Sequence, residues 1–514
     1  MDHNIGLMLE KRAHLNPKLE ACVEAESGRR FTYTELDARS NKTANMLLDQ
    51  GVKPGDRIAL LMMNGVEFIE TFFAIAKLGG VCVPLNWRLT GDELCFILKD
   101  SGSTTLMFSS DFTEVVEDIH GRGKDATDVA RWISVGERSA ISLDYDVLHA
   151  AASDAKPPVG AKDDDTLFIM YTSGTTGLPK GAVHTHNSTL WGSLTAIATS
   201  DMQQKDRYLL VLPLFHVGAL NPLIACVHAG GTAVVMRAFD LDAMWTNIEA
   251  EKITTMMAVP AMLNFMLLSG AKDTADYSTL RWVMSGAAPV PVTLIETYAD
   301  MGIEIHQVYG LTETCGPSCL IAPDDAIEKA GSTGKAFFHT DIRVVDSDSN
   351  DIAAGEVGEV LVSGRHIMKE YWNRPDATAE AIVDGWFHTG DLATMDADGF
   401  VYIQDRIKDM IISGGENIYP AEIENVLLSH PKIQDCAVIG QQSQQWGEVC
   451  LAVVVREDDS LTEAEIMKHC DGKVARYKMP KGVEFIDTIP RNPTGKALKR
   501  ILRDQFPGEE AKAS

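Results

Sequence analysis

The sequence predicts an α/β protein in which a large N-terminal domain precedes a small α+β domain. Three observations support this prediction: 514 residues with 45% hydrophobic content, alternating helical and strand patterns in the first half, and a change of pattern near residue 340. At about 100–200 residues per domain, the chain is long enough for several hydrophobic cores. Strands that alternate with helices are typical of βαβ units and mostly parallel sheets.

The elements of the first half follow in order. Residues 34–37 resemble a capping box, so we expect a helix from there to Leu48. The apolar run 57–63 predicts a buried strand, 68–78 has helical spacing, and 79–84 predicts a strand after a turn. Further strands are expected at residues 209–212, 232–236, 254–259 and 282–284.

From residue 340 the pattern changes to short strands joined by Gly and Asp turns. These strands, at 341–345, 358–363 and 399–404, fit a small barrel or an antiparallel layer. A compact α+β unit follows, with helices expected at 420–428 and 463–470 and strands expected at 436–440 and 448–455. We therefore divide the chain into a large domain, 1–404, and a small domain, 405–514.

The overall charge limits the classes of partner. With 46 Lys and Arg against 73 Asp and Glu, the net charge is −27 and repels phosphate backbones and anionic lipids. We therefore expect a small-molecule substrate, no nucleic acid, and at most weak peripheral membrane contact. The segment 476–503 is a local exception, because its eight Lys and Arg face only Glu484 and Asp487 and could receive an anion.

The cysteines and the termini indicate a compartment. Nine scattered cysteines without a CxxC pair indicate reduced thiols. The first residues lack the pattern of a secretory signal, and no window offers 18 uninterrupted apolar residues. These features predict a soluble, cytoplasmic protein. The oligomeric state is left open, with a homodimer as one candidate.

The strongest local motif is residues 171–181, which follow the apolar run 167–170. A strand that leads into hydroxyl and glycine residues can present backbone amides to a polyphosphate, with Lys180 as a fixed cation. The motif differs from a Walker A loop, where the Lys directly follows a Gly and precedes a hydroxyl residue. A flexible surface loop is the alternative. The small residues of the motif are Thr172, Ser173, Gly174, Thr175, Thr176 and Gly177.

Two further segments suit a nucleotide. In 307–314, an aromatic residue followed by Gly, hydroxyl and carboxylate groups could stack on a purine and offer oxygens to Mg²⁺, and 285–289 ends a strand with small residues. In 385–391, Asp391 could accept hydrogen bonds from ribose hydroxyls. Ordinary turns, or an Asp that caps a helix, are the alternatives for these segments.

Two segments near the C-terminus complete the set. Residues 404–420 place basic side chains ahead of an apolar strand and a Gly-Gly turn. Residues 490–496 form a loop stiffened by Pro and Gly that presents Lys496. A solvated surface lysine is the alternative for Lys496.

In this order and at these distances, the five segments resemble the adenylate-forming superfamily of acyl-CoA synthetases, firefly-type luciferases and nonribosomal-peptide adenylation domains. The resemblance runs from about Phe31 to Arg503 and, with His216 in 213–218, is most similar to fatty-acyl and aryl-acid CoA ligases. It implies two doubly wound α/β subdomains plus a small β-barrel, then a mobile C-terminal lid. It also implies that ATP, with Mg²⁺, activates an acid as acyl-AMP, which coenzyme A then converts to a thioester.

The resemblance also implies residue roles. Residues 172–180 would hold the β- and γ-phosphates, and Lys496 would bridge the acid's carboxylate and the α-phosphate; Lys496, Thr172, Glu313 and His216 form the expected catalytic group. Glu313 would bind Mg²⁺. The remaining nucleotide contacts are expected from Gly286, Ala287, Ala288, Tyr309 and Gly310 around the adenine, Thr312 at the α-phosphate, and Asp391 and Arg406 at the ribose.

Other implied roles concern the second half-reaction and the acid. Coenzyme A supplies the thiol, so no protein nucleophile is required, and His216 would line or gate the acyl site; a satisfied core histidine is the alternative. Lys408 would be the hinge of the C-terminal domain, whose rotation would withdraw Lys496. That rotation would bring Gly414 and Gly415 inward, and coenzyme A would be held by Trp446, Tyr477 and Lys481.

The acid itself is the least determined feature. We expect the acyl pocket among 216–220, 283–286, 308–310 and 314–318, which contain many small residues and no Arg or Asp to mark an amino or dicarboxylic acid. We favour a medium- or long-chain fatty acid, since each buried CH₂ contributes about 0.8 kcal/mol. A cinnamate- or benzoate-type acid, transfer to a carrier protein, a luciferase-like monooxygenase and an inactive binding module remain alternatives.

Overall fold

The computed structural model of the chain describes residues 3–172, 179–287, 290–413, 416–443, 446–474, 476–491 and 496–508. The chain divides into two compact units: the first comprises Met1–Ile342 and Val362–Phe387, and the second comprises Arg343–Leu361 and His388–Ser514. This division does not coincide with a single cut after residue 404, because 343–361 and 388–404 belong to the second unit. The mobility of a C-terminal domain stays a prediction.

The first unit contains two large sheets. The strands of the first sheet are β1 (Glu20–Glu24), β2 (Arg30–Thr32), β10 (Arg207–Leu210), β11 (Thr232–Val235), β12 (Thr255–Met257), β13 (Trp282–Gly286), β14 (Glu304–Tyr309), β15 (Cys319–Leu320) and β16 (Lys335–Ala336). Their order is β16-β15-β14-β13-β12-β10-β11-β1-β2. The central pairs from β1 to β14 are parallel, and β2, β15 and β16 pair antiparallel.

The second sheet has the same character. Its strands are β3 (Arg57–Leu61), β4 (Val81–Pro84), β5 (Thr105–Ser109), β6 (Arg131–Val135), β7 (Leu143–Asp144), β8 (Thr166–Thr172), β9 (Lys180–Thr185) and β19 (Glu370–Tyr371). Their order is β19-β9-β8-β4-β3-β5-β6-β7, parallel except where β9 joins β8 and β19. The predicted α/β architecture is therefore confirmed.

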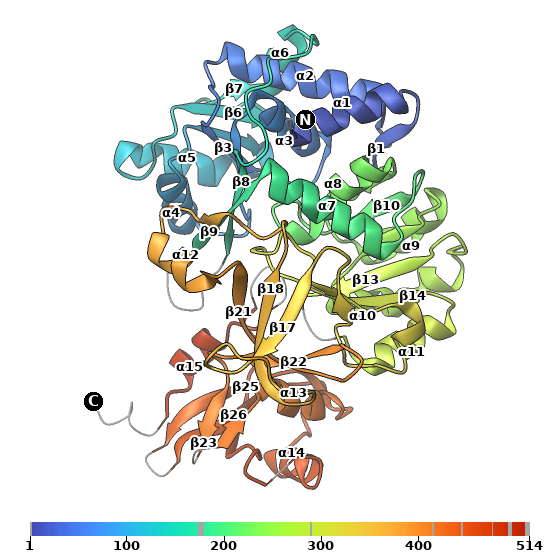
Figure 1. Cartoon of the computed structure of the whole chain (residues 1–514), viewed down its shortest axis with the longest axis vertical. Coiled ribbons are helices and arrows are strands. Elements are labelled where there is room, and N and C mark those ends of the chain that lie inside the picture. Colours follow the sequence, from blue (N-terminus) through green and yellow to red (C-terminus); the bar gives the residue numbers. More distant parts are fainter. Residues whose placement is uncertain are drawn as a thin grey trace. The chain divides into compact units, whose positions relative to one another are not determined.

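Helices cover both faces of each sheet. The helices of this unit are α1 (Ile5–Leu15), α2 (Tyr33–Asp49), α3 (Val66–Leu78), α4 (Gly91–Ser101), α5 (Thr113–Gly121), α6 (Tyr145–Ala151), α7 (His186–Ser200), α8 (Val217–Ala229), α9 (Leu241–Ala250), α10 (Pro260–Leu268), α11 (Val292–Asp300) and α12 (Pro375–Ala381). One core joins α1, α2, α3 and α8 to a face of both sheets. A second core lies under α9, α10 and α11, and a third lies under α4 and α5 (Figure 1).

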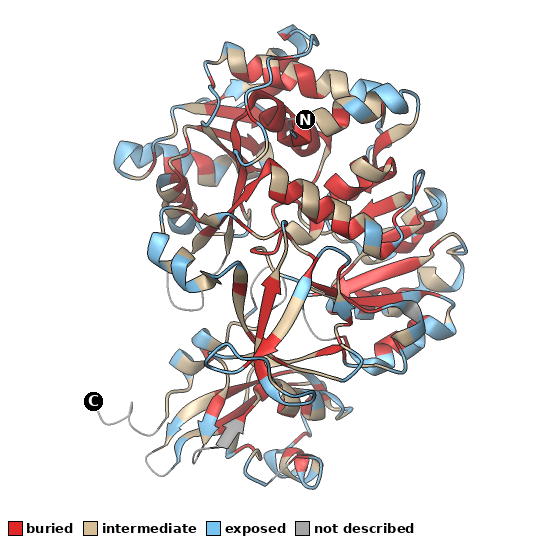
Figure 2. Ribbon diagram, viewed as in Figure 1, coloured by how far each residue is buried: buried red, intermediate tan, exposed pale blue. Residues whose placement is uncertain are grey.

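This arrangement explains the burial pattern of the sequence. A parallel sheet covered on both faces needs strands that are apolar throughout, and all residues of β4, β5 and β11 are buried. In the first unit, exposed residues concentrate on the outward sides of the helices and in the turns (Figure 2). The loops that follow the strand ends, rather than core residues, therefore reach the solvent.

The start of α2 corrects one local prediction. The capping box is formed by Thr32 and Glu35, where the Glu35 carboxylate accepts from the Thr32 backbone N–H at 2.8 Å, and not by residues 34–37. Because β2 ends at Thr32 and the Tyr33 side chain is fully buried, the chain must turn into the helix directly there. The hydroxyl of Tyr33 donates to the Gly231 carbonyl at 2.6 Å, which anchors this start.

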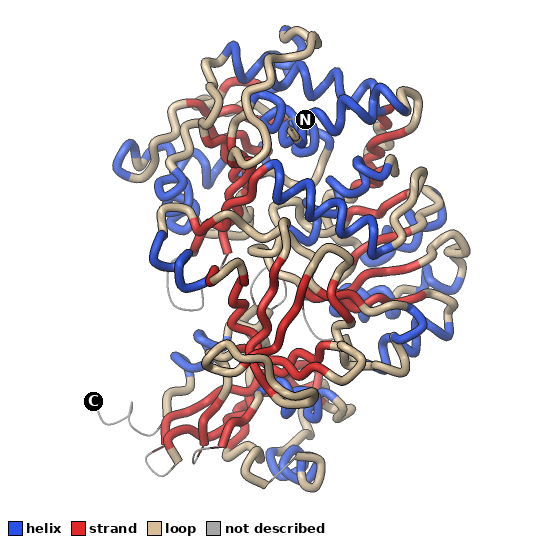
Figure 3. Tube along the Cα trace, in the orientation of Figure 1, coloured by secondary structure: helices blue, strands red, loops and turns tan. Residues whose placement is uncertain are grey.

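Strands prevail over helices in the second unit (Figure 3). Its elements, with the strands that connect it to the first unit, are β17 (Asp341–Val345), β18 (Val357–Ser363), β20 (Ile382–Val383), β21 (Trp386–Met395), β22 (Val401–Arg406), β23 (Ile411–Ser413), β24 (Glu416–Ile418), α13 (Pro420–Leu428), β25 (Ile433–Ser443), β26 (Gly447–Arg456), α14 (Glu463–Cys470), β27 (Gly482–Phe485) and α15 (Lys499–Gln505).

These strands form two smaller sheets. The third sheet has the order β17-β18-β21-β20 with β22 on β21, and the fourth has the order β24-β23-β26-β25 with β27 on β26. The pairings described for the third sheet form an open order, which fits the antiparallel-layer alternative, and barrel closure stays an expectation. In the fourth sheet, α13 and α14 pack with β25 and β26 around one apolar core.

Two chain-wide features complete the fold. Within the described residues, no helix is both long and apolar enough to cross a bilayer. All nine cysteines are described, and each is buried without a disulfide. Burial raises the pKa of the Cys315 thiol to about 12, so this thiol stays protonated at neutral pH.

Candidate functional site

The expected phosphate motif forms a β-hairpin between β8 and β9. Thr172 pairs with Lys180 across the two strands, and the Thr172 hydroxyl donates to the Lys180 carbonyl at 3.4 Å. The connecting residues Ser173, Gly174, Thr175, Thr176 and Gly177 lie outside the described residues. The ammonium nitrogen of Lys180 lies 4.9 Å from the centroid of the Tyr371 ring. The base of the hairpin therefore holds its lysine against an aromatic face.

The expected adenine residues lie at the carboxyl ends of β13 and β14. The two strands are parallel neighbours, with Gly286 opposite Val308, so the segments that follow them leave the sheet side by side. A Cβ on Gly286 would lie 2.3 Å from the Val308 carbonyl oxygen, so this close approach requires glycine. Ala287 is exposed with a φ of 68°, and Ala288 lies outside the described residues. Ligands of open α/β sheets bind at such carboxyl ends.

The turn that follows β14 is folded tightly on itself. A Cβ on Gly310 would lie 1.4 Å from the Gly316 carbonyl oxygen, which leaves no room for any side chain. The Gly316 N–H donates to the Leu311 carbonyl at 3.0 Å. This turn, with Tyr309 at the end of β14, leaves Thr312 partly exposed and buries Glu313.

Glu313 is held at its backbone and at its side chain. The Tyr371 hydroxyl donates to Oε1 of Glu313 at 2.8 Å, and the Met368 N–H donates to the Glu313 carbonyl at 2.7 Å. Since Lys180 lies against the Tyr371 ring, the expected phosphate lysine and the expected metal ligand share one tyrosine. The structure therefore brings the hairpin and the turn after β14 together.

His184 supports the same turn from β9. Complete burial lowers the pKa of His184 to about 4, so the imidazole is neutral. Its Nε2 lies 2.8 Å from the Thr312 carbonyl oxygen, which assigns the proton to Nε2. Sequence reasoning missed both His184 and Tyr371, because neither belongs to a polar motif. For His184, an imidazole beside the apolar residues Ala182 and Val183 of β9 is the available signal, whereas Tyr371 follows Lys369 and Glu370 and carries no such signal.

The chemistry of Glu313 fits a magnesium ion carried by a nucleotide. The described residues contain no group of three or more His, Cys, Asp or Glu that could hold a metal by themselves. Mg²⁺ is commonly bound through one or two carboxylates together with substrate phosphates. A single buried carboxylate with one oxygen engaged by Tyr371 matches that mode of binding.

The four segments expected to line the acyl pocket converge in the first unit. A Cβ on Gly316 would lie 3.7 Å from Val217 and 3.8 Å from Asn221, so the turn after β14 contacts α8. The Asn221 amide also lies 3.7 Å from the Cys315 sulfur. Together with the close pairs at Gly286 and Gly310, these contacts bring all four segments together.

His216 lies at the start of α8. Burial, followed by the nearby charge of Arg88, lowers the pKa of His216 to about 4. Its Nε2 atom is buried and has no hydrogen-bond partner within the described residues. The role of His216 at the acyl site stays a prediction, with a core histidine as the alternative. The neighbouring surface is apolar, since a Cβ on Gly218 would lie 3.7–3.9 Å from Met257 and Leu212.

The expected ribose residues form an ion pair in the second unit. Asp391 and Arg406 are paired across β21 and β22, with Nε of Arg406 3.0 Å from Oδ1 of Asp391. Asp391 is buried, and its backbone N–H donates to the Thr389 hydroxyl at 3.0 Å. The sheet register thus fixes the carboxylate and the guanidinium side by side.

Lys496 belongs to the same electrostatic neighbourhood. Lys496 is exposed as a whole residue. The protein atoms that surround its ammonium group desolvate that group and, with the nearby charge of Arg406, lower the pKa of Lys496 to about 8. Asp391, Asp409 and Asp405 act in the opposite direction. The structure therefore gathers the expected ribose residues and the expected catalytic lysine within one unit.

The residues expected for the hinge and for coenzyme A lie on separate parts of the second unit. Lys408 is exposed in the turn after β22, and Gly414 and Gly415 lie outside the described residues. Trp446 follows β25 and is 48% exposed, Tyr477 is 43% exposed, and Lys481 is exposed just before β27. These roles stay predictions.

The basic segment 476–503 is less open to anions than its composition suggested. Among the described residues, four of its eight cations form ion pairs with acids of the same unit. The pairs are Lys478–Glu422, Arg491–Asp435, Lys499–Glu424 and Arg503–Asp409, at 2.5–2.9 Å. Residues distant in sequence therefore neutralise about half of the basic side chains in this segment.

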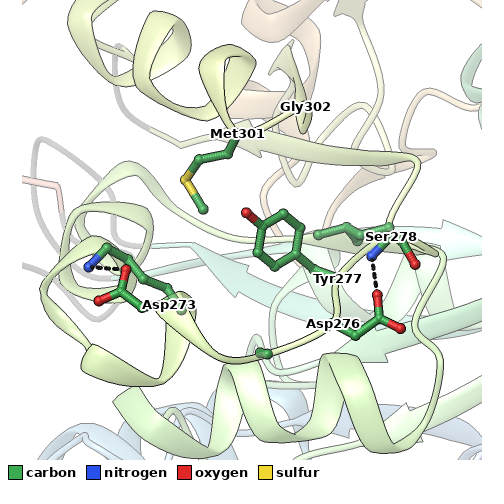
Figure 4. A pocket seen from close by; sticks show the side chains of 9 residues that line it. Asp273, Asp276, Tyr277, Ser278, Met301 and Gly302 are labelled. Atoms are coloured by element: carbon green, nitrogen blue, oxygen red, sulfur yellow. Dashed lines mark hydrogen bonds and ion pairs between the residues drawn. The ribbon is translucent and has the colours of Figure 1, made fainter.

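Two surface hollows lie away from these residues. One hollow, of about 350 Å³, is lined by Tyr277, Met301 and Gly302, among others (Figure 4). Its lining also includes an ion pair between Lys272 and Asp273 and a hydrogen bond from the Ser278 N–H to the Asp276 carboxylate. The other, of about 450 Å³, is lined by Trp191, Arg365, Asp163 and Asp164 among others. Neither contains a residue expected in the site, so the contacts above, rather than these hollows, define the candidate site.

Comparisons with known proteins identify the family of the chain. The family model for AMP-binding enzymes matches residues 9–372, and the model for the AMP-binding enzyme C-terminal domain matches residues 422–496. The chain is 45% identical to a long-chain-fatty-acid–CoA ligase of Mycobacterium tuberculosis, covering 98% of both chains. It is 40% identical to a feruloyl-CoA synthase of Amycolatopsis, covering 98% of this chain and 99% of the other.

A solved structure is similar over the same length. The o-succinylbenzoate coenzyme A synthetase of Bacillus subtilis, in complex with ATP and a magnesium ion, is 33% identical with a TM-score of 0.88. The similarity covers 98% of this chain and 100% of that chain.

Proposed function

The chain belongs to the family of AMP-binding enzymes, and from this premise we propose that it is an AMP-forming acyl-CoA synthetase. It activates a carboxylic acid with ATP and transfers the acyl group to coenzyme A. The observation that supports this best is the contact chain Lys180–Tyr371–Glu313, which places a phosphate-binding cation and a metal-binding carboxylate on one tyrosine.

The residues of the first unit would bind the nucleotide. Lys180 and the hairpin would hold the β- and γ-phosphates, Tyr309 would contact the adenine, and Thr312 would contact the α-phosphate. When bound through Glu313 and the phosphates, Mg²⁺ neutralises charge on the polyphosphate. Gln307 lies near the carboxyl end of β14, and its buried Nε2 has no partner in the described part of the chain. It is a further candidate for contact with the adenine.

The residues of the second unit would stabilise the reacting groups. Asp391 and Arg406 would hold the ribose, and Lys496 would hold the carboxylate and the α-phosphate as negative charge develops between them. A carboxylate resists attack by a thiol, and the bond to AMP replaces one of its oxygens with a good leaving group. The thiol of coenzyme A then attacks the acyl carbon, which releases AMP without a protein nucleophile.

We propose a medium- or long-chain fatty acid as the substrate, with an aryl acid as the alternative. The apolar surroundings of Gly218 and the neutral ring of His216 suit a hydrocarbon chain. The similarity to the fatty-acid ligase is also higher than that to the feruloyl-CoA synthase. A cytoplasmic location and at most weak membrane contact are finer proposals that follow from the charge and composition of the sequence. Homodimer formation stays one candidate for the oligomeric state.

Pyrophosphate release across a panel of straight-chain and aryl acids, with and without coenzyme A, tests this function. We expect release with straight-chain acids, and acyl-CoA only when coenzyme A is present. Ferulate as the best substrate would support the aryl alternative, and acyl-AMP without acyl-CoA would indicate a carrier-protein ligase. If no acid released pyrophosphate, the proposed function would be wrong.

Lys496→Ala tests the assigned chemistry within this function. Because electrostatic stabilisation is typically the largest catalytic contribution, we expect adenylation to slow by roughly 10²–10³-fold. Thioester formation from supplied acyl-AMP should change less. Lys468→Ala, which removes an exposed lysine from the surface of α14, is the matched control and should adenylate normally. A folded Lys496→Ala variant with the wild-type adenylation rate would exclude this role.

A further inference from the structure

Tyr371 contacts two expected functional groups at once but belongs to neither motif. Its hydroxyl donates to Oε1 of Glu313 at 2.8 Å, and its ring lies 4.9 Å from the Lys180 ammonium. A hydrogen bond to a charged carboxylate is stronger than one between neutral groups, and a cation within about 6 Å of a ring centroid is attracted to the ring. Tyr371 therefore restrains a cation and a carboxylate that the sequence separates by more than a hundred residues.

The position of Tyr371 is fixed by its backbone. In β19, Tyr371 pairs with Ala182 of β9, two residues after Lys180. The flanking bonds are short: the Lys369 N–H donates to the Val183 carbonyl at 2.8 Å, and the Trp372 N–H donates to the Gly181 carbonyl at 2.7 Å. The residue is only 8% exposed.

The same segment also fixes the backbone of Glu313. The Met368 N–H donates to the Glu313 carbonyl, while Tyr371 donates to the Glu313 carboxylate. Because Glu313 is held at its backbone carbonyl and at Oε1, its second carboxylate oxygen, Oε2, has a restricted direction. Mg²⁺ demands a nearly ideal octahedral geometry, so a ligand oxygen with a fixed direction favours its binding.

We propose that Tyr371 is a positioning residue that orients Glu313 toward the magnesium ion of Mg·ATP and holds Lys180 in register with it. This inference rests on the proposed function. The hydroxyl acts on the carboxylate, and the ring acts on the lysine. The two roles are separable, because Tyr371→Phe removes only the hydroxyl and Tyr371→Leu removes the hydroxyl and the ring.

Calorimetric binding of a non-hydrolysable ATP analogue, with Mg²⁺ and with EDTA, tests the proposal. For Tyr371→Phe we expect a loss of about 10–100-fold in affinity with Mg²⁺ and little change in EDTA, from the usual strength of hydrogen bonds to charged groups. For Tyr371→Leu we expect a loss in EDTA as well, because Lys180 loses its support. In turnover, the KM for Mg·ATP should rise more than kcat falls.

Tyr298→Phe is the matched control for a lost buried hydroxyl. Its hydroxyl donates to the Leu263 carbonyl at 2.8 Å, away from the candidate site, and the variant should bind the analogue as the wild type does. The proposal is overturned if Tyr371→Phe retains wild-type affinity, or loses affinity equally with Mg²⁺ and EDTA. If either result is obtained while the wild type releases pyrophosphate, this inference fails and the proposed function stands. A wild type that neither binds the analogue nor releases pyrophosphate would refute the proposed function as well.

Discussion

Gly310→Ala should disrupt adenylation through the turn that carries Thr312 and Glu313. The added Cβ would lie 1.4 Å from the Gly316 carbonyl oxygen, whereas such contacts are essentially never below 3.0 Å. One side of the turn must therefore move by about 1.6 Å. A 1 Å misplacement of positioned groups can cost about 10²-fold in rate, so we expect at least that loss.

Pyrophosphate release with the best acid measures this effect, and the thermal unfolding midpoint reports on the fold. Gly270→Ala is the matched control, because its Cβ would have no neighbour within 4 Å and its φ is not positive. We expect the control to keep full activity. The Gly310→Ala variant should lose activity while the overpacking costs about 1–3 kcal/mol of stability. If Gly310→Ala released pyrophosphate within threefold of the wild type, the turn would not position the nucleotide.

Two pH effects follow from the buried groups. Burial lowers the pKa values of His184, His186 and His366 from 6.5 to about 4. The free energy of unfolding is therefore unaffected by these imidazoles above pH 6.5. It decreases below pH 6.5, because protons then bind the unfolded chain but not the folded one. At pH 5 each imidazole lowers the free energy of unfolding by about 2 kcal/mol. The thermal unfolding midpoint of His366→Gln should therefore fall less between pH 7 and pH 5 than that of the wild type. Parallel profiles of the two proteins would contradict this. For Lys496, with a pKa of about 8, kcat/KM should fall above pH 8, and Lys496→Arg should remove that fall if charge alone is required.

Local patterns predicted the elements well where the helices are amphipathic and where the strands are buried on both faces. The helices α13 and α14 have the predicted bounds, and the buried strands lie within a few residues of their predicted positions. An apolar strand between two layers of helices is hydrophobic along nearly its whole length, and the flanking turn residues distinguish such a short run from a buried helix. The capping box of α2 was misplaced by two residues, because Thr32 and Thr34 offer similar sequence signals and only the end of β2 decides between them.

The motif chemistry was also accessible from the sequence, but not the groups that support it. Thr172, Lys180, Gly286, Tyr309 and Glu313 stand at or just beyond the ends of strands, where small, hydroxyl, aromatic and charged residues gather in the sequence, and the family resemblance supplied their expected roles. Their roles toward the nucleotide stay predictions, whereas their convergence is described by the structure.

The sequence by itself determined the order of the elements, the α/β class and the residue types offered to a nucleotide, because periodicity and turn chemistry are local properties of the chain. Only the tertiary structure decided that Tyr371 joins Lys180 to Glu313, that His184 holds Thr312, and that acids elsewhere neutralise half of the basic segment 476–503. These contacts depend on which strands become neighbours. The order of strands in a sheet is set by the packing of the whole unit, so no local pattern records it.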